Sequence, residues 1–213
     1  MASDPAPGRA AETKTRAASE RDAQARKAWR EAAAPLDPEQ VVLVDESGTT
    51  SSRTRWSGWA PQDHRATRSV PRQHGKHTPV VAALAPDGLH EPWLIEGARD
   101  RATCVCYLTE PLAPTLRPGQ GVLLDNLTVP KAHSSRQAIA ARHCQLRFLP
   151  PSSPDCTPIE QAFSTIKAIL RGLGARTKEA LQEAVRLASE AITRHDAPAW
   201  FTHAGYALSA QAP

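Results

Sequence analysis

The feature that most constrains the fold is a pair of short apolar runs that each end in an aspartate. Residues 41–44 read VVLV and precede Asp45, and residues 122–124 read VLL and precede Asp125. Neither run alternates apolar and polar residues, which is typical of a central strand covered on both faces. Sites in mixed α/β sheets lie at the carboxyl ends of parallel strands, so we expect both aspartates at one edge of such a sheet.

The rest of the chain predicts the other elements of a mixed α/β domain. Residues 78–84 and a run near 93–95 predict strands that form, with 41–44, three consecutive antiparallel strands. A helix after Asp100 is predicted to end at Pro111, because a proline inside a helix costs about 3 kcal/mol or more. Further elements are a helix over 131–143, a strand over 146–149, a helix from 158 stopped by glycines 172 and 174, a helix from Thr177 that ends before Pro198, and an aromatic tail over 200–206 that packs back on the domain.

Glu160 lies in the first turn of the predicted helix that begins at 158. With Thr157 as the N-cap and Pro158 at the first helical position, Glu160 matches a capping box, in which its carboxylate bonds back to the Thr157 backbone. Taken alone, Glu160 fits this structural role and metal binding equally well. Its combination with Asp45 and Asp125 favours metal binding.

Three carboxylates from separate elements suit phosphoryl transfer with two metal ions. Two Mg²⁺ ions about 3.5–4 Å apart can stabilise both the attacking and the leaving oxygen. We therefore predict that Asp45, Asp125 and Glu160 are catalytic and bind two Mg²⁺ ions, with Mn²⁺ as a substitute. Consecutive strand side chains point to opposite faces, so only one of Asp45 and Glu46 can face the site. Asp45 is predicted as the ligand because it follows its apolar run in the same way as Asp125.

The distribution of charge points to a polyanionic partner. Residues 45–80 carry six Arg or Lys against three acids, and residues 131–176 carry seven against two. Lys167 and Arg171 share a helix face with Glu160, and they are predicted to contact DNA phosphates. The alternative is that these cations form an ordinary solvated face.

Other classes of protein are disfavoured. The sequence has no G-x-S-x-G elbow, no glycine-rich phosphate loop with its lysine and no H-E-x-x-H motif. Its four cysteines form no C-x-x-C pair, which favours a reducing, cytoplasmic location, here in association with the nucleoid. No apolar stretch approaches the roughly 20 residues that a membrane-spanning helix needs.

These motifs together resemble a known family. V-D-E-x-G at 44–48, L-D-N at 124–126, and L-P-P-x-S-P-D at 149–155 followed by P-I-E at 158–160 look like the catalytic blocks of DDE transposases. The spacing of 34 residues between Asp125 and Glu160 is similar to that of the bacterial insertion-sequence branch of the mariner superfamily.

The resemblance implies a ribonuclease-H-like sheet with helices on both faces and Mg²⁺-dependent cutting and joining of double-stranded DNA at transposon ends and targets. It also implies a phosphate contact from Arg55, and Glu46, Asn126 and Thr157 as residues that surround the metal ligands. The predicted organisation is disorder over 1–9, a helical arm over 10–38, the catalytic domain over 39–207 and a loose tail over 208–213. The expected assembly is a homodimer, or a complex with a separate helix-turn-helix part that this sequence does not show.

A second hypothesis remains open. The sequence departs from the family pattern at Gly75, Pro111, Pro130 and Thr157. The chain could therefore be an inactive or truncated remnant that binds DNA or a full-length transposase.

Overall fold

A five-stranded sheet forms the centre of the molecule. The computed structural model describes residues 23–33, 37–50, 54, 58–67, 69, 77–95, 101–125, 133–150 and 157–206. The strand order is β3-β2-β1-β4-β5, with β1 (Val41–Thr50), β2 (His77–Ala85), β3 (Gly88–Leu94), β4 (Gly121–Leu124) and β5 (Gln145–Phe148). β1, β2 and β3 pair antiparallel, whereas β4 and β5 run parallel to β1. The predicted mixed sheet with three consecutive antiparallel strands is confirmed.

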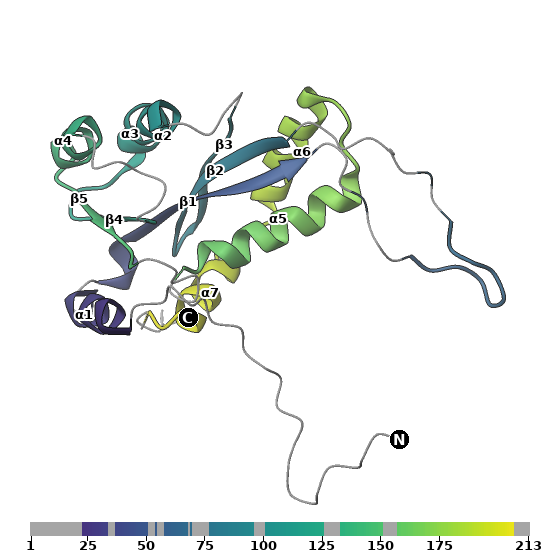
Figure 1. The fold of residues 1–213 in the computed structure, drawn as a ribbon, viewed down its shortest axis with the longest axis horizontal. Coiled ribbons are helices and arrows are strands. Elements are labelled where there is room, and N and C mark those ends of the chain that lie inside the picture. Colours follow the sequence, from purple (N-terminus) through teal and green to yellow (C-terminus); the bar gives the residue numbers. More distant parts are fainter. Residues whose placement is uncertain are drawn as a thin grey trace, which may run out of the picture.

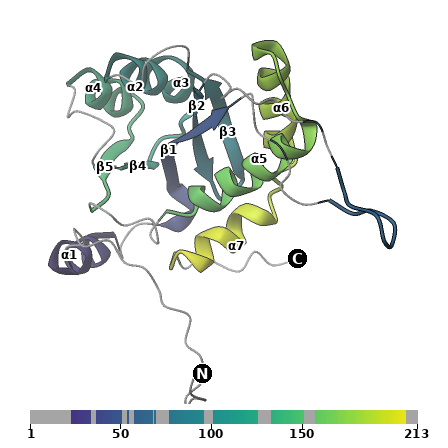
Figure 2. The same ribbon diagram turned by 45° about the vertical axis from the view of Figure 1, so that its right-hand side comes forward.

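Helices cover both faces of this sheet, as predicted. The helices are α1 (Ala23–Ala33), η1 (Pro38–Gln40), α2 (Arg101–Tyr107), η2 (Leu108–Leu112), α3 (Ala113–Thr115), α4 (His133–Ala141), α5 (Ile159–Leu173), α6 (Lys178–Glu190) and α7 (Asp196–His203). Figures 1 and 2 show α5, α6 and α7 on one face and α2, α3 and α4 on the other. In the described part of the chain, no helix combines the length and apolarity needed to cross a membrane.

Each face of the sheet carries its own buried cluster. The first cluster joins Leu43 and Leu123 to Phe163 of α5 and Phe201 of α7. The second joins the opposite face to α2, η2, α3 and α4, with Tyr107 fully buried. Burying one Leu or Phe side chain stabilises a fold by about 1.5–3 kcal/mol. These contacts fix α5, which carries Glu160, on the central strands.

β1 is longer than the sequence predicted. Its parallel pairing with β4 ends at Val44, opposite Leu124, but its antiparallel pairing with β2 continues to Thr50. Asp45 therefore lies inside a strand, where the parallel pairing stops, and not at the end of a strand.

Pro111 does not end its helix, so that prediction is wrong. The chain continues from α2 through the π-helical turn η2 into α3, and the Ala113 N–H donates to the Leu108 carbonyl five residues earlier. A proline disturbs an α-helix because it lacks an N–H and crowds the preceding turn. The wider π turn accommodates this residue.

The C-terminal helices differ in part from the prediction. Gly174 alone ends α5, in a left-handed conformation with φ 64°, whereas Gly172 lies inside the helix. Thr177 caps α6 as predicted, accepting a hydrogen bond of 3.1 Å from the Ala180 N–H. Pro198 lies in the first turn of α7, a helix that the sequence analysis missed. A proline is harmless there because the first N–H groups of a helix have no partner within it.

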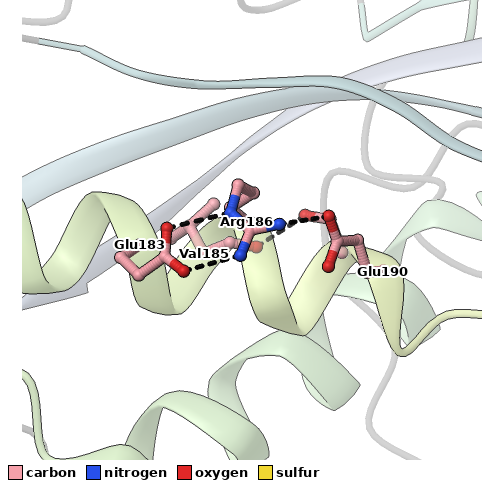
Figure 3. A network of polar contacts seen from close by, with 5 residues as sticks. Glu183, Val185, Arg186 and Glu190 are labelled. Atoms are coloured by element: carbon pink, nitrogen blue, oxygen red, sulfur yellow. Dashed lines mark hydrogen bonds and ion pairs between the residues drawn. The ribbon is translucent and has the colours of Figure 1, made fainter.

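The exposed side of α6 is held by an ion-pair network (Figure 3). Arg186 donates to Glu183 through Nε at 2.9 Å and Nη2 at 2.6 Å, and it also contacts Glu190 one turn later. The Ser189 hydroxyl donates to the Val185 carbonyl at 2.7 Å. Such exposed pairs contribute little to stability, because water and salt screen them. The charge of Arg186 is thus engaged within α6.

Candidate active site

β1 turns Asp45 toward α5. Leu43 belongs to the same buried cluster as Phe163 of α5, whereas Val44 belongs to the cluster on the opposite face. Because strand side chains alternate between faces, Asp45 faces α5 and Glu46 faces α2. This arrangement supports the choice of Asp45 over Glu46 as the carboxylate of the site.

The surroundings of Cys104 locate Glu46 on the far face. Burial and, to a smaller extent, the nearby charge of Glu46 raise the pKa of the Cys104 thiol to about 11. Cys104 lies on α2, which covers the face opposite α5. Glu46 therefore stands behind the strand that presents Asp45.

β4 places Asp125 beside Asp45. Val44 pairs with Leu124, so the next residue of each strand is one of the two aspartates. Leu123 belongs to the cluster on the α5 face, and alternation puts Asp125, two residues later, on that face too. The two aspartates come from adjacent strands and share one face.

α5 supplies Glu160 from above the same face. The backbone enters the helix at Pro158, with φ −58° and ψ −21°, and the Glu160 N–H donates to the Thr157 carbonyl at 3.2 Å. Ile159 and Phe163 hold this end of α5 in the core, while the Glu160 side chain is exposed. Pro158, and not Thr157 as predicted, is therefore the N-cap, so the helix begins one residue later than the sequence predicted. The Glu160 carboxylate is exposed in its first turn.

The three carboxylates interact electrostatically. Burial, the largest cause, and the charges of Glu160, Asp125 and Glu46 together raise the pKa of Asp45 from 3.8 to about 7. The Glu46 N–H, which donates to Asp45 Oδ1 at 2.7 Å, acts in the opposite direction. Within the described part of the chain, the charges that act on Asp45 are therefore negative, and no cation offsets them.

The donor set suits a hard divalent cation. Among the described residues, no three His, Cys, Asp or Glu side chains are grouped so that they could hold a metal ion together. Mg²⁺ is usually bound through only one or two carboxylates and keeps several water and substrate oxygens. A cation would also relieve the repulsion that contributes to the raised pKa of Asp45. The oxygen donors present therefore suit the predicted metal in their chemistry.

The other predicted residues are placed only in part. Lys167 and Arg171 are half-buried on α5, seven and eleven residues after Glu160, on the same side of the helix. Thr157 is buried next to the start of α5. Arg55 and Asn126, which were also predicted to belong to the site, lie outside the described residues.

The sequence analysis missed the contribution of Arg147. Its Nη1 donates to the Ala32 carbonyl of α1 at 3.2 Å. Arg147 also pairs with Leu123, two residues before Asp125. The signal available in the sequence was a charged residue in an otherwise apolar strand, which indicates a strand edge that meets another element.

One family model and several solved structures are similar to this chain. A family model described as DDE superfamily endonuclease matches residues 40–182. A Mos1 transposase paired-end complex with left transposon end is similar, with a TM-score of 0.66 and 14% identity over 92% of this chain and 63% of that chain. The catalytic domain of Mos1 mariner transposase is similar with a TM-score of 0.56 and 12% identity, over 85% of this chain and 83% of that chain.

These likenesses establish the fold. The predicted ribonuclease-H-like α/β architecture is confirmed by the match to Mos1. The chain spans only 63% of the Mos1 chain in the paired-end complex. No curated protein matches the sequence.

Proposed function

The chain belongs to the DDE superfamily of endonucleases, and from this premise we propose that it is the catalytic domain of a DNA transposase. Its activity would be divalent-metal-dependent cleavage of DNA strands at transposon ends, followed by joining of the ends to target DNA. The observation that supports the proposal is that Asp45 and Asp125 lie on adjacent strands on the face that α5 covers, where the charges of Glu160 and Asp125 contribute to the raised pKa of Asp45.

Asp45, Asp125 and Glu160 would hold two Mg²⁺ ions, or Mn²⁺ in their place. When bound, the ions supply positive charge that stabilises the attacking and leaving oxygens of a phosphodiester. One crystal structure that the chain resembles is described as a mariner Mos1 paired-end complex with Mg, and another as one with Mn. These descriptions concern Mos1 and support the choice of metals here.

The reaction consists of two in-line displacements at phosphorus. In the first, a water oxygen attacks the phosphodiester at the transposon end and the P–O3′ bond breaks; the water gives one proton to the solvent, and the leaving 3′-oxygen takes up one proton from the solvent and becomes a hydroxyl. In the second, that 3′-OH attacks a target phosphodiester and loses its proton to the solvent, while the displaced target 3′-oxygen takes up a proton and leaves as a hydroxyl. The carboxylates of this chain fix the geometry of both steps, and no covalent bond to the protein is needed.

The remaining residues would bind and orient the DNA. Lys167 and Arg171 lie along α5 from Glu160, so they can contact successive phosphates of a strand that crosses the site. We propose the same role for Arg55. Glu46, Asn126 and Thr157 would hold the ligand-bearing segments in place.

The wider assignments follow from the same proposal. The catalytic domain would comprise residues 39–207, and the chain would belong to the bacterial insertion-sequence branch. Its partners would be double-stranded DNA and either a second copy or a separate helix-turn-helix part, and it would act at the nucleoid. The Mos1 structures are described as complexes with a transposon end and as a strand transfer complex, which supports DNA as the partner.

Thermal unfolding with added Mg²⁺ or Mn²⁺ separates metal binding from helix capping at Glu160. Ligand at ten times its Kd stabilises a native protein by about 1.4 kcal/mol, which raises the Tm of a domain of this size by roughly 3–6 °C. We expect this rise in the wild type and its loss in Glu160→Gln.

The matched control is Glu179→Gln. Glu179 is an exposed glutamate in the first turn of α6, as Glu160 is in α5. If Glu160 only stabilises a helix start, the two variants will respond to metal alike, and the assignment fails. If the wild type gains no stability in millimolar metal, the remnant hypothesis is preferred.

A further inference from the structure

The carboxyl-terminal half of helix α1 contacts two different parts of the domain. The Trp29 ring packs edge-on against Tyr206, with ring centroids 6.5 Å apart, and Tyr206 packs in turn on the buried ring of Phe201 at 5.4 Å. One turn later, the Ala32 carbonyl accepts a hydrogen bond of 3.2 Å from Arg147 of β5. We call these contacts the clasp; they join the N-terminal arm to the C-terminal segment and to the edge of the sheet.

The clasp lies on the same face as the three carboxylates. Arg147 pairs with Leu123, and Leu149, two residues after Arg147, belongs to the cluster under α5. Alternation therefore puts Arg147 on the α5 face, with Asp125 two residues beyond its pairing partner. The carboxyl end of α1 thus lies beside β5, next to β4, the strand that precedes Asp125 (Figures 1 and 2).

The physical properties of α1 make its order depend on this docking. The described part of α1 has 11 residues, and a helical segment of this length is marginal on its own in water, where about 12–15 residues are needed. Its exposed ion pair between Lys27 and Glu31, at 4.0 Å, is too weak to compensate. Arg147 places a positive charge at the carboxyl end of α1, where it interacts favourably with the helix dipole.

We propose that α1 is a strap, that is, a segment that stays helical only while the contacts of the clasp hold it against β5 and the C-terminal segment. Trp29 and Arg147 are its positioning residues. Resting on the proposed function, the docked strap holds α1 beside β5, next to β4, the strand that leads into Asp125, and so contributes to the positioning of DNA at the carboxylates.

Hydrogen exchange of the full chain tests the strap directly. In the wild type we expect the amides of α1 to be protected, and in Trp29→Ala we expect at least tenfold faster exchange there with the sheet amides unchanged. Tyr206→Ala should have the same effect from the opposite partner, and Trp29→Phe should restore most of the protection. Lys27→Ala is the matched control, because it changes an exposed residue of the same helix and should alter exchange less than threefold.

Unprotected α1 amides in the wild type, or equal exchange in wild type and Trp29→Ala, would overturn the strap. The effect on DNA cleavage is measured separately. We expect Trp29→Ala to cleave DNA at least tenfold more slowly than the wild type while its Tm still rises with added metal. A cleavage rate equal to that of the wild type would refute the positioning role. A wild type that neither binds metal nor cleaves would refute the proposed function, while the exchange result still decides the strap.

Discussion

Asp125→Asn is expected to abolish metal-dependent strand cleavage, lowering its rate by at least about a thousandfold, or roughly 4 kcal/mol in the barrier. Asp125 lies beside Asp45 on the adjacent strand, and its charge is among those that raise the pKa of Asp45. An amide keeps the shape of the side chain but removes one negative ligand from a site that depends on anionic oxygen for Mg²⁺. Nicking of supercoiled plasmid DNA in Mg²⁺ or Mn²⁺ measures the loss.

Asp63→Asn provides the control for this experiment. Asp63 is exposed and has a positive φ of 65°, a conformation that asparagine tolerates well. The Asp63→Asn variant should therefore cleave DNA at the wild-type rate. Full metal-dependent cleavage by Asp125→Asn would show that this aspartate is not a ligand, and the assigned triad would be wrong.

Asp45→Asn should stabilise the protein at alkaline pH when chelator removes divalent metal. Folding raises the pKa of Asp45 from 3.8 to about 7, so the folded state holds this proton more tightly than the unfolded state does. The stability that Asp45 contributes is full below about pH 4 and is lost as pH rises through 7. A shift of about three units corresponds to a penalty on the order of 4 kcal/mol above pH 7.

Asparagine carries no charge at any pH, so the variant escapes this penalty. The gain in Tm of Asp45→Asn over wild type should be small at pH 4, rise to pH 8, and reach several degrees. Mg²⁺ at pH 8 should raise the Tm of the wild type but not that of Asp45→Asn. A gain that is equal at pH 5 and pH 8 would show that Asp45 does not sit among the charges described, and Asp63→Asn should show no pH-dependent gain.

The sequence predicted the parts of the site that depend on short-range pattern. Continuous apolar runs identified β1 and β4, and strand alternation separated Asp45 from Glu46. Thr157 and Pro158 located the start of α5 to within one residue, because a helix start depends on short-range sequence. These features need no knowledge of what packs where.

The parts that failed depend on tertiary surroundings. The polar end of β1 was not recognised as strand, because its burial comes from β2 and the overlying helices: Thr49 is 2% exposed. Pro111 and Pro198 were both taken as helix ends, yet one is absorbed by a π turn and the other stands in a first turn. The contact of Arg147 with Ala32 joins residues 115 positions apart, which no local pattern reveals.

The two kinds of strand pairing at β1 have a consequence for the order of assembly. Its antiparallel neighbour β2 is joined to β3 by a tight turn, so the pairing of β2 with β3 closes a short loop, whereas the pairing of β1 with β4 joins distant positions. Long-range closure is the slower event in folding. Asp45 and Asp125 become neighbours only through that late pairing, so we expect pulse-labelled exchange to protect the β2–β3 hairpin before β4. A partly folded or nascent chain would then hold a formed hairpin while the two aspartates are still apart.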